Sequence, residues 1–130
     1  MRILIVDDDA VGRKTMRYIL SEFGDCVLTE NAEETLAEFK KAWNDWRPYT
    51  LITLDIELPD MNGMDLLSKI RGLEEDKSIP ENERVKIIMV SSYSDRDHVV
   101  GCFKAGCNEF AVKPTDKEMI VTKLSNMGFL

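Results

Sequence analysis

Hydrophobic residues along the chain form two kinds of segment. Five short runs are rich in Ile, Leu, Val and other β-favouring residues, and polar or turn-forming residues bound each of them. These runs cover residues 2–6, 26–29, 50–55, 85–90 and 110–112. Between and after the runs, hydrophobic residues recur every three or four positions, the spacing that gathers side chains on one face of an α-helix. The pattern therefore predicts five β-strands alternating with five α-helices.

Capping and turn-forming residues predict where several of these helices begin and end. Gly24 is expected to end the first helix as a left-handed cap, and Asn31 to begin the second. Pro48 is expected to stop the second helix. Asp95 and Gly106 are expected to cap the two ends of the fourth. The second helix is expected to bury one stripe of side chains, namely Ala32, Leu36, Phe39, Trp43 and Trp46.

The third and last helices have predicted limits of a different kind. The third is expected over residues 63–73, followed by a polar loop over residues 74–83 that contains Pro80. Before the last helix, Thr115 and Glu118 have the spacing of a capping box, in which each side chain accepts a hydrogen bond from the other residue's backbone N–H.

Alternating strands and helices predict an α/β fold, a doubly wound parallel sheet with helices on both faces. In such sheets, ligands bind beyond the carboxyl ends of the strands, at the point where the strand order reverses. Polar residues at four predicted strand ends are therefore expected to share one cleft. They are Asp7, Asp8 and Asp9 after the first strand, Asp55 after the third, Ser91 and Ser92 after the fourth, and Lys113 after the fifth.

Several carboxylates in one cleft repel one another, and a bound Mg²⁺ ion, which prefers oxygen ligands, relieves that repulsion. Asp8 and Asp55 are the expected ligands, with Asp7 binding directly or through water and a backbone carbonyl just past Asp55 adding an oxygen. Lys113 adds an ammonium and Ser91 a hydroxyl. A carboxylate in these surroundings is suited to accept a phosphoryl group.

Composition narrows the class of protein. The chain has 130 residues, enough for one domain, and its hydrophobic and charged fractions of 44% and 32% are typical of soluble proteins. A net charge of −7 argues against nucleic-acid binding through the general surface. No hydrophobic run is long enough for a membrane span or a signal peptide. Three cysteines, an odd number without a Cys-x-x-Cys motif, favour reduced thiols and a cytoplasmic location.

Four segments together resemble the receiver domain of response regulators, the single-domain chemotaxis type found in two-component phosphorelay signalling. The segments are Ile5-Val6-Asp7-Asp8-Asp9, Leu54-Asp55-Ile56-Glu57-Leu58-Pro59-Asp60-Met61-Asn62-Gly63, Met89-Val90-Ser91-Ser92 and Phe110-Ala111-Val112-Lys113-Pro114. The resemblance implies a flavodoxin-like fold with strand order 2-1-3-4-5, and five helices placed two on one face and three on the other. We expect one receiver domain over residues 1–130 with no output domain.

The resemblance also implies a phosphorylation site and a metal site. Asp55 would accept phosphate from a sensor histidine kinase, a phosphotransfer protein or a small phosphodonor. Asp7 and Asp8 would hold Mg²⁺, with Asp8 the more direct ligand, and Glu57 would contribute its backbone carbonyl. Such a domain is a signalling switch that catalyses only its own phosphorylation and dephosphorylation. Its downstream target is a protein that the sequence does not identify, and we expect a monomer or a weak phosphorylation-dependent dimer.

A switch is implied by the remaining positions. Lys113 would pair with the phosphoryl group, and its peptide bond to Pro114 would be cis, which X-Pro bonds permit. Phosphorylation of Asp55 would draw the Ser91 hydroxyl toward the phosphoryl group and let Phe110 turn inward. The face formed by the fourth helix, fifth strand and last helix would then change for a partner.

Two alternatives and one smaller hypothesis remain open from the sequence. The first alternative is a phosphatase of the haloacid-dehalogenase type, in which Asp7 is the nucleophile. The second is a receiver-like interaction module that takes no phosphate. The smaller hypothesis concerns Glu57 and Tyr93, which lie two residues past Asp55 and Ser91. Tyr93 either slows hydrolysis of the phosphoryl group by its bulk or is a simple surface residue.

Overall fold

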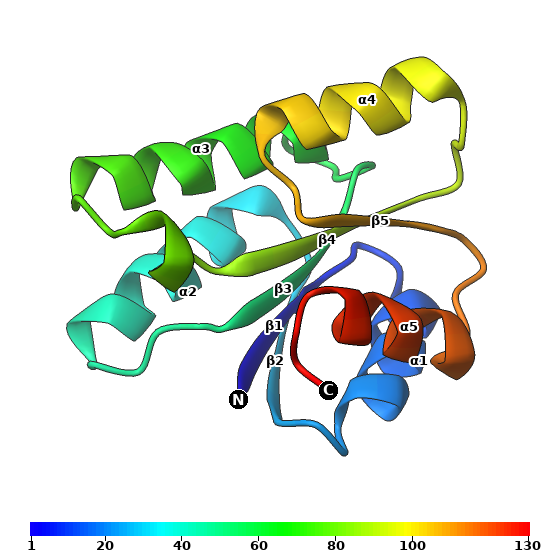
Figure 1. Cartoon of the computed structure of the whole chain (residues 1–130), viewed down its shortest axis with the longest axis horizontal. Helices are drawn as coiled ribbons and strands as arrows, with labels where there is room; N and C mark the ends of the chain where they lie inside the picture. Colours follow the sequence, from blue (N-terminus) through cyan, green and yellow to red (C-terminus); the bar gives the residue numbers. More distant parts are fainter.

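The computed structural model describes residues 1–130, and strands and helices alternate along the whole chain (Figure 1). The strands are β1 (Arg2–Val6), β2 (Asp25–Thr29), β3 (Leu51–Asp55), β4 (Lys86–Ser91) and β5 (Glu109–Val112). The α-helices are α1 (Ala10–Leu20), α2 (Ala32–Asn44), α3 (Gly63–Asp76), α4 (Arg96–Ala105) and α5 (Lys117–Asn126), and a short 3-10 helix covers Glu81–Glu83. None of the helices combines the length and hydrophobicity needed to cross a membrane.

All five strands are parallel and lie in the order β2-β1-β3-β4-β5, which confirms the predicted sheet. The chain moves outward from β1 to β2 and then returns past β1 to β3, so the strand order reverses between β1 and β3. The carboxyl ends of these two neighbouring strands therefore frame the crevice in which an open α/β sheet binds its ligands.

Helices cover both faces of the sheet (Figure 1). The residues of the two cores place α1 and α5 on one face and α2, α3 and α4 on the other, as predicted. Side chains alternate between the faces along each strand because successive residues of a strand point in opposite directions. On the face covered by α2, α3 and α4 the buried strand residues include Leu4, Val6, Ile52, Leu54, Ile87 and Met89. On the face covered by α1 and α5 they include Ile3, Ile5, Leu51, Ile88, Val90 and Ala111.

Three predicted helix caps are confirmed. Asn31 accepts a hydrogen bond from the backbone N–H of Glu34, and Asp95 accepts one from the N–H of His98. Gly106 ends α4 with a φ of 111°, in the left-handed region where glycine avoids the strain of a side chain. These side chains and this backbone turn satisfy polar groups that a helix end leaves unpaired.

Two other caps were predicted wrongly. Helix α1 ends at Leu20, and Ser21 stays right-handed, so Gly24 does not cap it. Gly24 is instead required by close packing, because a Cβ there would lie 2.2 Å from the carbonyl oxygen of Met1. At α5 the cap is Asp116, whose carboxylate accepts from the N–H of Met119 at 2.8 Å. Asp116 replaces the predicted capping box because an ionised carboxylate one residue later suits the positive helix end.

The prediction that Trp46 belongs to the buried stripe of α2 is also wrong. Helix α2 ends at Asn44, so the helical spacing no longer applies two residues later. Trp46 has a positive φ of 59° and a side chain that is 91% exposed. The stripe itself exists, since Phe39 is buried and Trp43 packs against it at a ring separation of 4.6 Å.

The predicted polar loop at 74–83 begins too early, because α3 continues to Asp76 and Glu74 is only 1% exposed. Glu74 is tolerated there because both carboxylate oxygens are paired. Arg71 donates to one of them at 2.7 Å, and the backbone N–H of Val85 donates to the other at 2.8 Å. This pairing allows a charged side chain to stay inside the protein.

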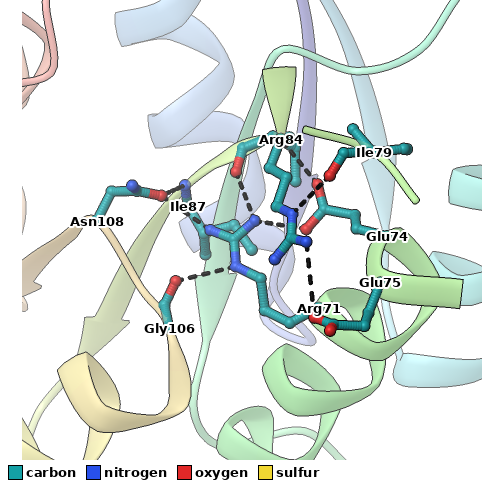
Figure 2. Close-up of polar contacts among 9 residues, drawn as sticks. Arg71, Glu74, Glu75, Ile79, Arg84, Ile87, Gly106 and Asn108 are labelled. Atoms are coloured by element: carbon teal, nitrogen blue, oxygen red, sulfur yellow. Dashed lines mark hydrogen bonds and ion pairs between the residues drawn. The ribbon is translucent and has the colours of Figure 1, made fainter. Parts of the chain in front are cut away.

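Arg71, Glu74 and Asn108, here called the Arg71 cluster, join α3 to the starting ends of β4 and β5 (Figure 2). Besides Glu74, Arg71 donates to the carbonyl oxygen of Gly106 at 3.0 Å and to the side-chain oxygen of Asn108 at 2.9 Å. The same Asn108 oxygen accepts the N–H of Ile87. The cluster lies at the edge of the sheet opposite the crevice and fixes the end of α4 there.

Candidate functional site

Three carboxylates meet at the carboxyl ends of β1 and β3. Asp7 and Asp8 directly follow β1, and Asp55 is the last residue of β3. The two strands are hydrogen-bonded neighbours, so one oxygen from each of the three carboxylates lies within 4.8 Å of the others. Asp7 and Asp55 are buried, whereas Asp8 is exposed and opens the group to solvent. We call Asp7, Asp8 and Asp55 the acidic cluster.

Lys113, just past the end of β5, is the cation that the structure places against this cluster. Its Nζ lies 3.0 Å from Oδ2 of Asp55 and 3.5 Å from Oδ2 of Asp7. The Lys113–Pro114 peptide bond is cis. One ammonium thus pairs with two buried carboxylates, and the acidic cluster keeps an excess of negative charge.

The shortage of positive charge is reflected in the acidity of Asp55. Burial raises its pKa to about 6, the nearby charge of Asp7 adds to the rise, and hydrogen bonds from Lys113 and from the N–H of Glu57 oppose it. Burial also acts to lower the pKa of Lys113, but the hydrogen bond and charge of Asp55, with those of Asp7, outweigh burial and raise it. The site therefore favours a further cation.

The arrangement of oxygens suits a hard divalent cation such as Mg²⁺, which takes few protein ligands and keeps several waters. Asp7 uses Oδ1 to accept the N–H of Asp9 at 2.9 Å, and Asp55 uses Oδ1 to accept the N–H of Glu57 at 3.1 Å. These bonds orient both carboxylates and leave their Oδ2 atoms facing the Lys113 ammonium. Glu57 lies two residues after Asp55, in the loop between β3 and α3, and is exposed.

Ser91, the last residue of β4, is fully buried beside the site. Its Oγ accepts a hydrogen bond from the N–H of Tyr93 at 2.9 Å and makes none with Asp55. Because Val90 pairs with Asp55 in the sheet, Ser91 lies one position further along its strand. The predicted switch hydroxyl is thus adjacent to the acidic cluster and bonded to its own turn.

Phe110 is also buried, at 7% exposure, in the core beneath α2, α3 and α4. It lies opposite Met89 on the neighbouring strand β4, and two residues further along the two strands Ser91 lies opposite Val112. Ser91 and Phe110 therefore face the same side of the sheet. The structure shows Phe110 in the inward position, together with a Ser91 hydroxyl that does not contact Asp55.

A cavity of about 340 Å³ opens beside the acidic cluster, between the start of α1 and the segment that links β5 to α5. Asp7 and Lys113 line it on the polar side, and Val11, Met16 and Pro114 contribute apolar surface. The cavity therefore borders the buried Asp7 and the half-buried Lys113 on the side of α1.

Comparison with known proteins identifies the family. The chain matches the family model of the response regulator receiver domain over residues 3–125. It belongs to that family. The receiver is 33% identical over 124 residues to chemotaxis protein CheY1 of Helicobacter pylori, with 95% of this chain and 94% of that protein covered. It is 30% identical over 129 residues to chemotaxis protein CheY of Thermotoga maritima, covering 98% and 97%.

Solved structures agree with this assignment. A CheY-like receiver domain protein from Methanospirillum hungatei has a TM-score of 0.79 and 30% identity, over 97% of this chain and 91% of that one. CheY in the CheX-CheY-BeF3-Mg²⁺ complex of Borrelia burgdorferi has a TM-score of 0.82 and 25% identity, over 98% and 88%. The protein is therefore a CheY-like phosphoacceptor switch of two-component signalling, not a classical enzyme. The haloacid-dehalogenase alternative is not favoured.

Two contacts of this receiver were not foreseen from the sequence. A Cβ on Gly12 would lie 2.2 Å from Oδ2 of Asp7, so only glycine lets α1 come this close to the acidic cluster. Arg13 donates to the backbone carbonyl of Asp7 at 2.9 Å. Helical spacing alone does not predict these contacts. The only sequence signal is that Gly12 and Arg13 lie side by side in the first turn of α1, close behind Asp7.

Proposed function

We propose that Asp55 is the phosphoacceptor and that Mg²⁺ binds at Asp7, Asp8, Asp55 and the backbone carbonyl of Glu57. The observation that carries this proposal is the buried Asp55 carboxylate, which shares one lysine with Asp7. Strongly perturbed ionisable groups in a cleft are typical of functional sites, because burial is maintained there at a cost in stability. A relative of known structure supports the proposal that Mg²⁺ binds here, since the CheY of Borrelia burgdorferi was crystallised with BeF3 and Mg²⁺.

In this proposal the chemical step is an in-line transfer to a carboxylate oxygen. An ionised oxygen of Asp55 forms a bond to phosphorus while the bond from phosphorus to the donor's histidine nitrogen breaks, and that nitrogen leaves with the bonding electron pair. The N–H of Glu57 holds Oδ1 of Asp55 in place, and Lys113 stands 3.0 Å from Oδ2, where it can pair with oxygens of the incoming group. Bound Mg²⁺ would neutralise charge on the transferred phosphoryl oxygens.

The same proposal assigns the readout to Ser91 and Phe110. The Ser91 hydroxyl exchanges its bond from the Tyr93 N–H for one to the phosphoryl group, which rearranges the turn before α4. Phe110 already occupies its inward position, so phosphorylation would stabilise that position instead of creating it. The responding face comprises α4, β5 and α5, where Val100 and Phe103 of α4 are 39% and 46% exposed. Tyr93, in the turn before α4, is 52% exposed.

The donor in this proposal is a sensor histidine kinase or a phosphotransfer protein, and the target is a protein that reads the α4–β5–α5 face. A family match over residues 3–125 supports one receiver domain for the described chain. We also propose a cytoplasmic location, where the three cysteines would stay reduced. We expect a monomer or a weak phosphorylation-dependent dimer.

The test is phosphorylation by acetyl phosphate, followed by intact mass spectrometry. Wild-type protein is expected to gain the mass of one phosphoryl group with Mg²⁺ and none with EDTA. Asp55→Asn is expected to gain none under either condition, while Asp45→Asn, a change at an exposed carboxylate far from the site, behaves as wild type. Full phosphorylation of Asp55→Asn contradicts the proposal, and a wild type that binds Mg²⁺ but takes no phosphate supports the interaction-module alternative.

A further inference from the structure

The loop from β3 to α3, residues 56–62, carries the backbone carbonyl expected to bind Mg²⁺, and its base is fixed on the sheet. The N–H of Ile56 donates to the carbonyl of Val90 at 3.1 Å, and the N–H of Gly63 donates to the carbonyl of Ile56 at 2.7 Å. Glu57 and Asn62 form an isolated antiparallel bridge above this base. The loop is therefore closed on itself, and its far end, which carries Asp60, lies between the bridged residues Glu57 and Asn62.

That far end is attached to a different helix. Asp60 accepts the N–H of Ala32 on Oδ1 at 2.8 Å and the N–H of Glu33 on Oδ2 at 3.0 Å. These are the first two amides of α2, which begins 28 residues earlier in the chain, and the next amide, that of Glu34, is capped by Asn31. Both oxygens of an exposed carboxylate are thus used to satisfy amides that would otherwise lack a partner in the helix.

Helix α2 is in turn placed relative to the acidic cluster. The hydroxyls of Thr29 and Thr35 are 2.7 Å apart and buried, joining the end of β2 to the first turns of α2. The N–H of Asp7 donates to the carbonyl of Thr29 at 3.2 Å. Fixed contacts therefore run from Asp7 through β2 and α2 to Asp60, and back along the loop to Asp55.

We propose that Asp60 is a positioning residue for the metal site: its double bond to the start of α2 holds the β3–α3 loop so that the Glu57 carbonyl stays directed at the acidic cluster. This inference rests on the proposed function, because it assumes Mg²⁺ at that cluster. The lowered pKa of Asp60, caused first by the hydrogen bond from Ala32 and also by that from Glu33, agrees with a carboxylate that remains ionised in its place. Groups that orient metal ligands typically change metal affinity by about 10- to 100-fold when removed.

The experiment compares Asp60→Ala with Asn31→Ala. Both variants remove a cap from the start of α2, but only Asp60→Ala frees the loop. Mg²⁺ affinity, measured by calorimetric titration, is expected to fall about tenfold in Asp60→Ala and to stay within about twofold of wild type in Asn31→Ala. In protein without metal, backbone hydrogen exchange over residues 57–62 is expected to accelerate only in Asp60→Ala.

The Mg²⁺ affinities separate a positioning role of Asp60 from a general requirement for an intact start of α2. Wild-type affinity in Asp60→Ala overturns the inference, and so does an equal loss in both variants, since the intact helix end would then be what matters. A wild type that binds no Mg²⁺ overturns the proposed function and the metal role of Asp60 with it. In that case unchanged hydrogen exchange in Asp60→Ala would further show that Asp60 does not hold the loop at all.

Discussion

The two ends of the sheet each contain buried charge, and they treat it in opposite ways. At the starting edge, Arg71 pairs with Glu74 (Figure 2). Glu74 has a second donor in the N–H of Val85. At the carboxyl edge, Asp7 and Asp55 share the single ammonium of Lys113, and the pKa of Asp55 rises to about 6, mainly through burial.

The difference separates a structural group from a functional one. A buried carboxylate with a cation and a matched amide donor holds elements together, because each desolvated charge regains a partner. Two carboxylates that share one cation stay short of positive charge even though each accepts one amide N–H, so a metal ion is bound more tightly. Substitutions at the two ends are therefore expected to change different properties of the molecule.

The largest expected effect is on folding stability at the Arg71 end. Arg71→Met removes the guanidinium and leaves Glu74 buried without its cation, which is expected to cost about 3–5 kcal/mol of unfolding free energy in urea titrations. Arg84→Met is the matched control, since Arg84 contacts an exposed Glu75 and one backbone carbonyl, and it is expected to cost about 1 kcal/mol or less. An Arg71→Met cost as small as that of Arg84→Met would contradict the comparison.

Asp55→Asn is expected to raise the free energy of unfolding, whereas Arg71→Met lowers it. Because the folded pKa of Asp55 is about 6, above the ordinary value of 3.8, the folded state binds more protons than the unfolded state between these pH values. The free energy of unfolding without metal therefore falls as pH rises through this window, and the full loss of stability is reached above about pH 6. Asp55→Asn is expected to be about 2 kcal/mol more stable than wild type at pH 7.5, and the two proteins are expected to become equally stable below about pH 4.

Mg²⁺ is expected to restore the stability that the wild type loses when Asp55 is ionised. At one hundred times its dissociation constant, a ligand that binds only the folded state adds about 2.7 kcal/mol. Thermal or urea unfolding of wild type and of Arg71→Met should show this gain, and Asp55→Asn should show much less of it. If Mg²⁺ stabilises all three proteins alike, the ion binds somewhere other than the acidic cluster.

A smaller effect is expected at Gly12. In Gly12→Ala, the added Cβ must displace the Asp7 carboxylate, and Mg²⁺ affinity is expected to fall about tenfold, or about 1.4 kcal/mol. Gly72→Ala is the control: Gly72 is also within a helix, but its Cβ would meet nothing within 4 Å. That control is expected to bind Mg²⁺ as wild type and to gain up to about 1 kcal/mol of stability. Equal Mg²⁺ affinity in both variants would show that the close approach of α1 is irrelevant to the site.

The smallest effect concerns phosphate lifetime. Tyr93 stacks on His98 at a ring separation of 5.4 Å and is half exposed, and its N–H contacts the Ser91 hydroxyl. Tyr93→Ala is expected to lose phosphate only a few-fold faster, as followed by intact mass after removal of the donor. An unchanged rate would make Tyr93 a surface residue, and His98→Ala, which releases the ring, provides the comparison.

The fold and most of the acidic cluster were predictable from the sequence because they depend on local periodicity and on strand ends. Once five strands alternate with helices, topology rules bring Asp7, Asp55 and Lys113 to one edge. The separate resemblance to receivers supplied the strand order and the roles of individual residues.

What was not predictable depends on contacts between distant parts of the chain. The sequence around Glu74 predicts the start of a polar loop, but in the structure Glu74 is paired with Arg71 and with the amide of Val85, which lies 11 residues later, just before β4. Asp60 reads as a turn residue, yet its partners begin a helix 28 positions earlier. Trp46 was misplaced for a local reason, since α2 ends at Asn44 and helical spacing no longer applies beyond it.

The most direct test of the central claim is to locate the phosphoryl group. Wild-type protein is treated with acetyl phosphate and Mg²⁺, and borohydride then reduces the aspartyl phosphate to homoserine, which peptide mass spectrometry places in the sequence. We expect homoserine at position 55 and nowhere else in the acidic cluster. Homoserine at position 7 or 8, with Asp55 unmodified, would contradict the assignment of Asp55 as the phosphoacceptor.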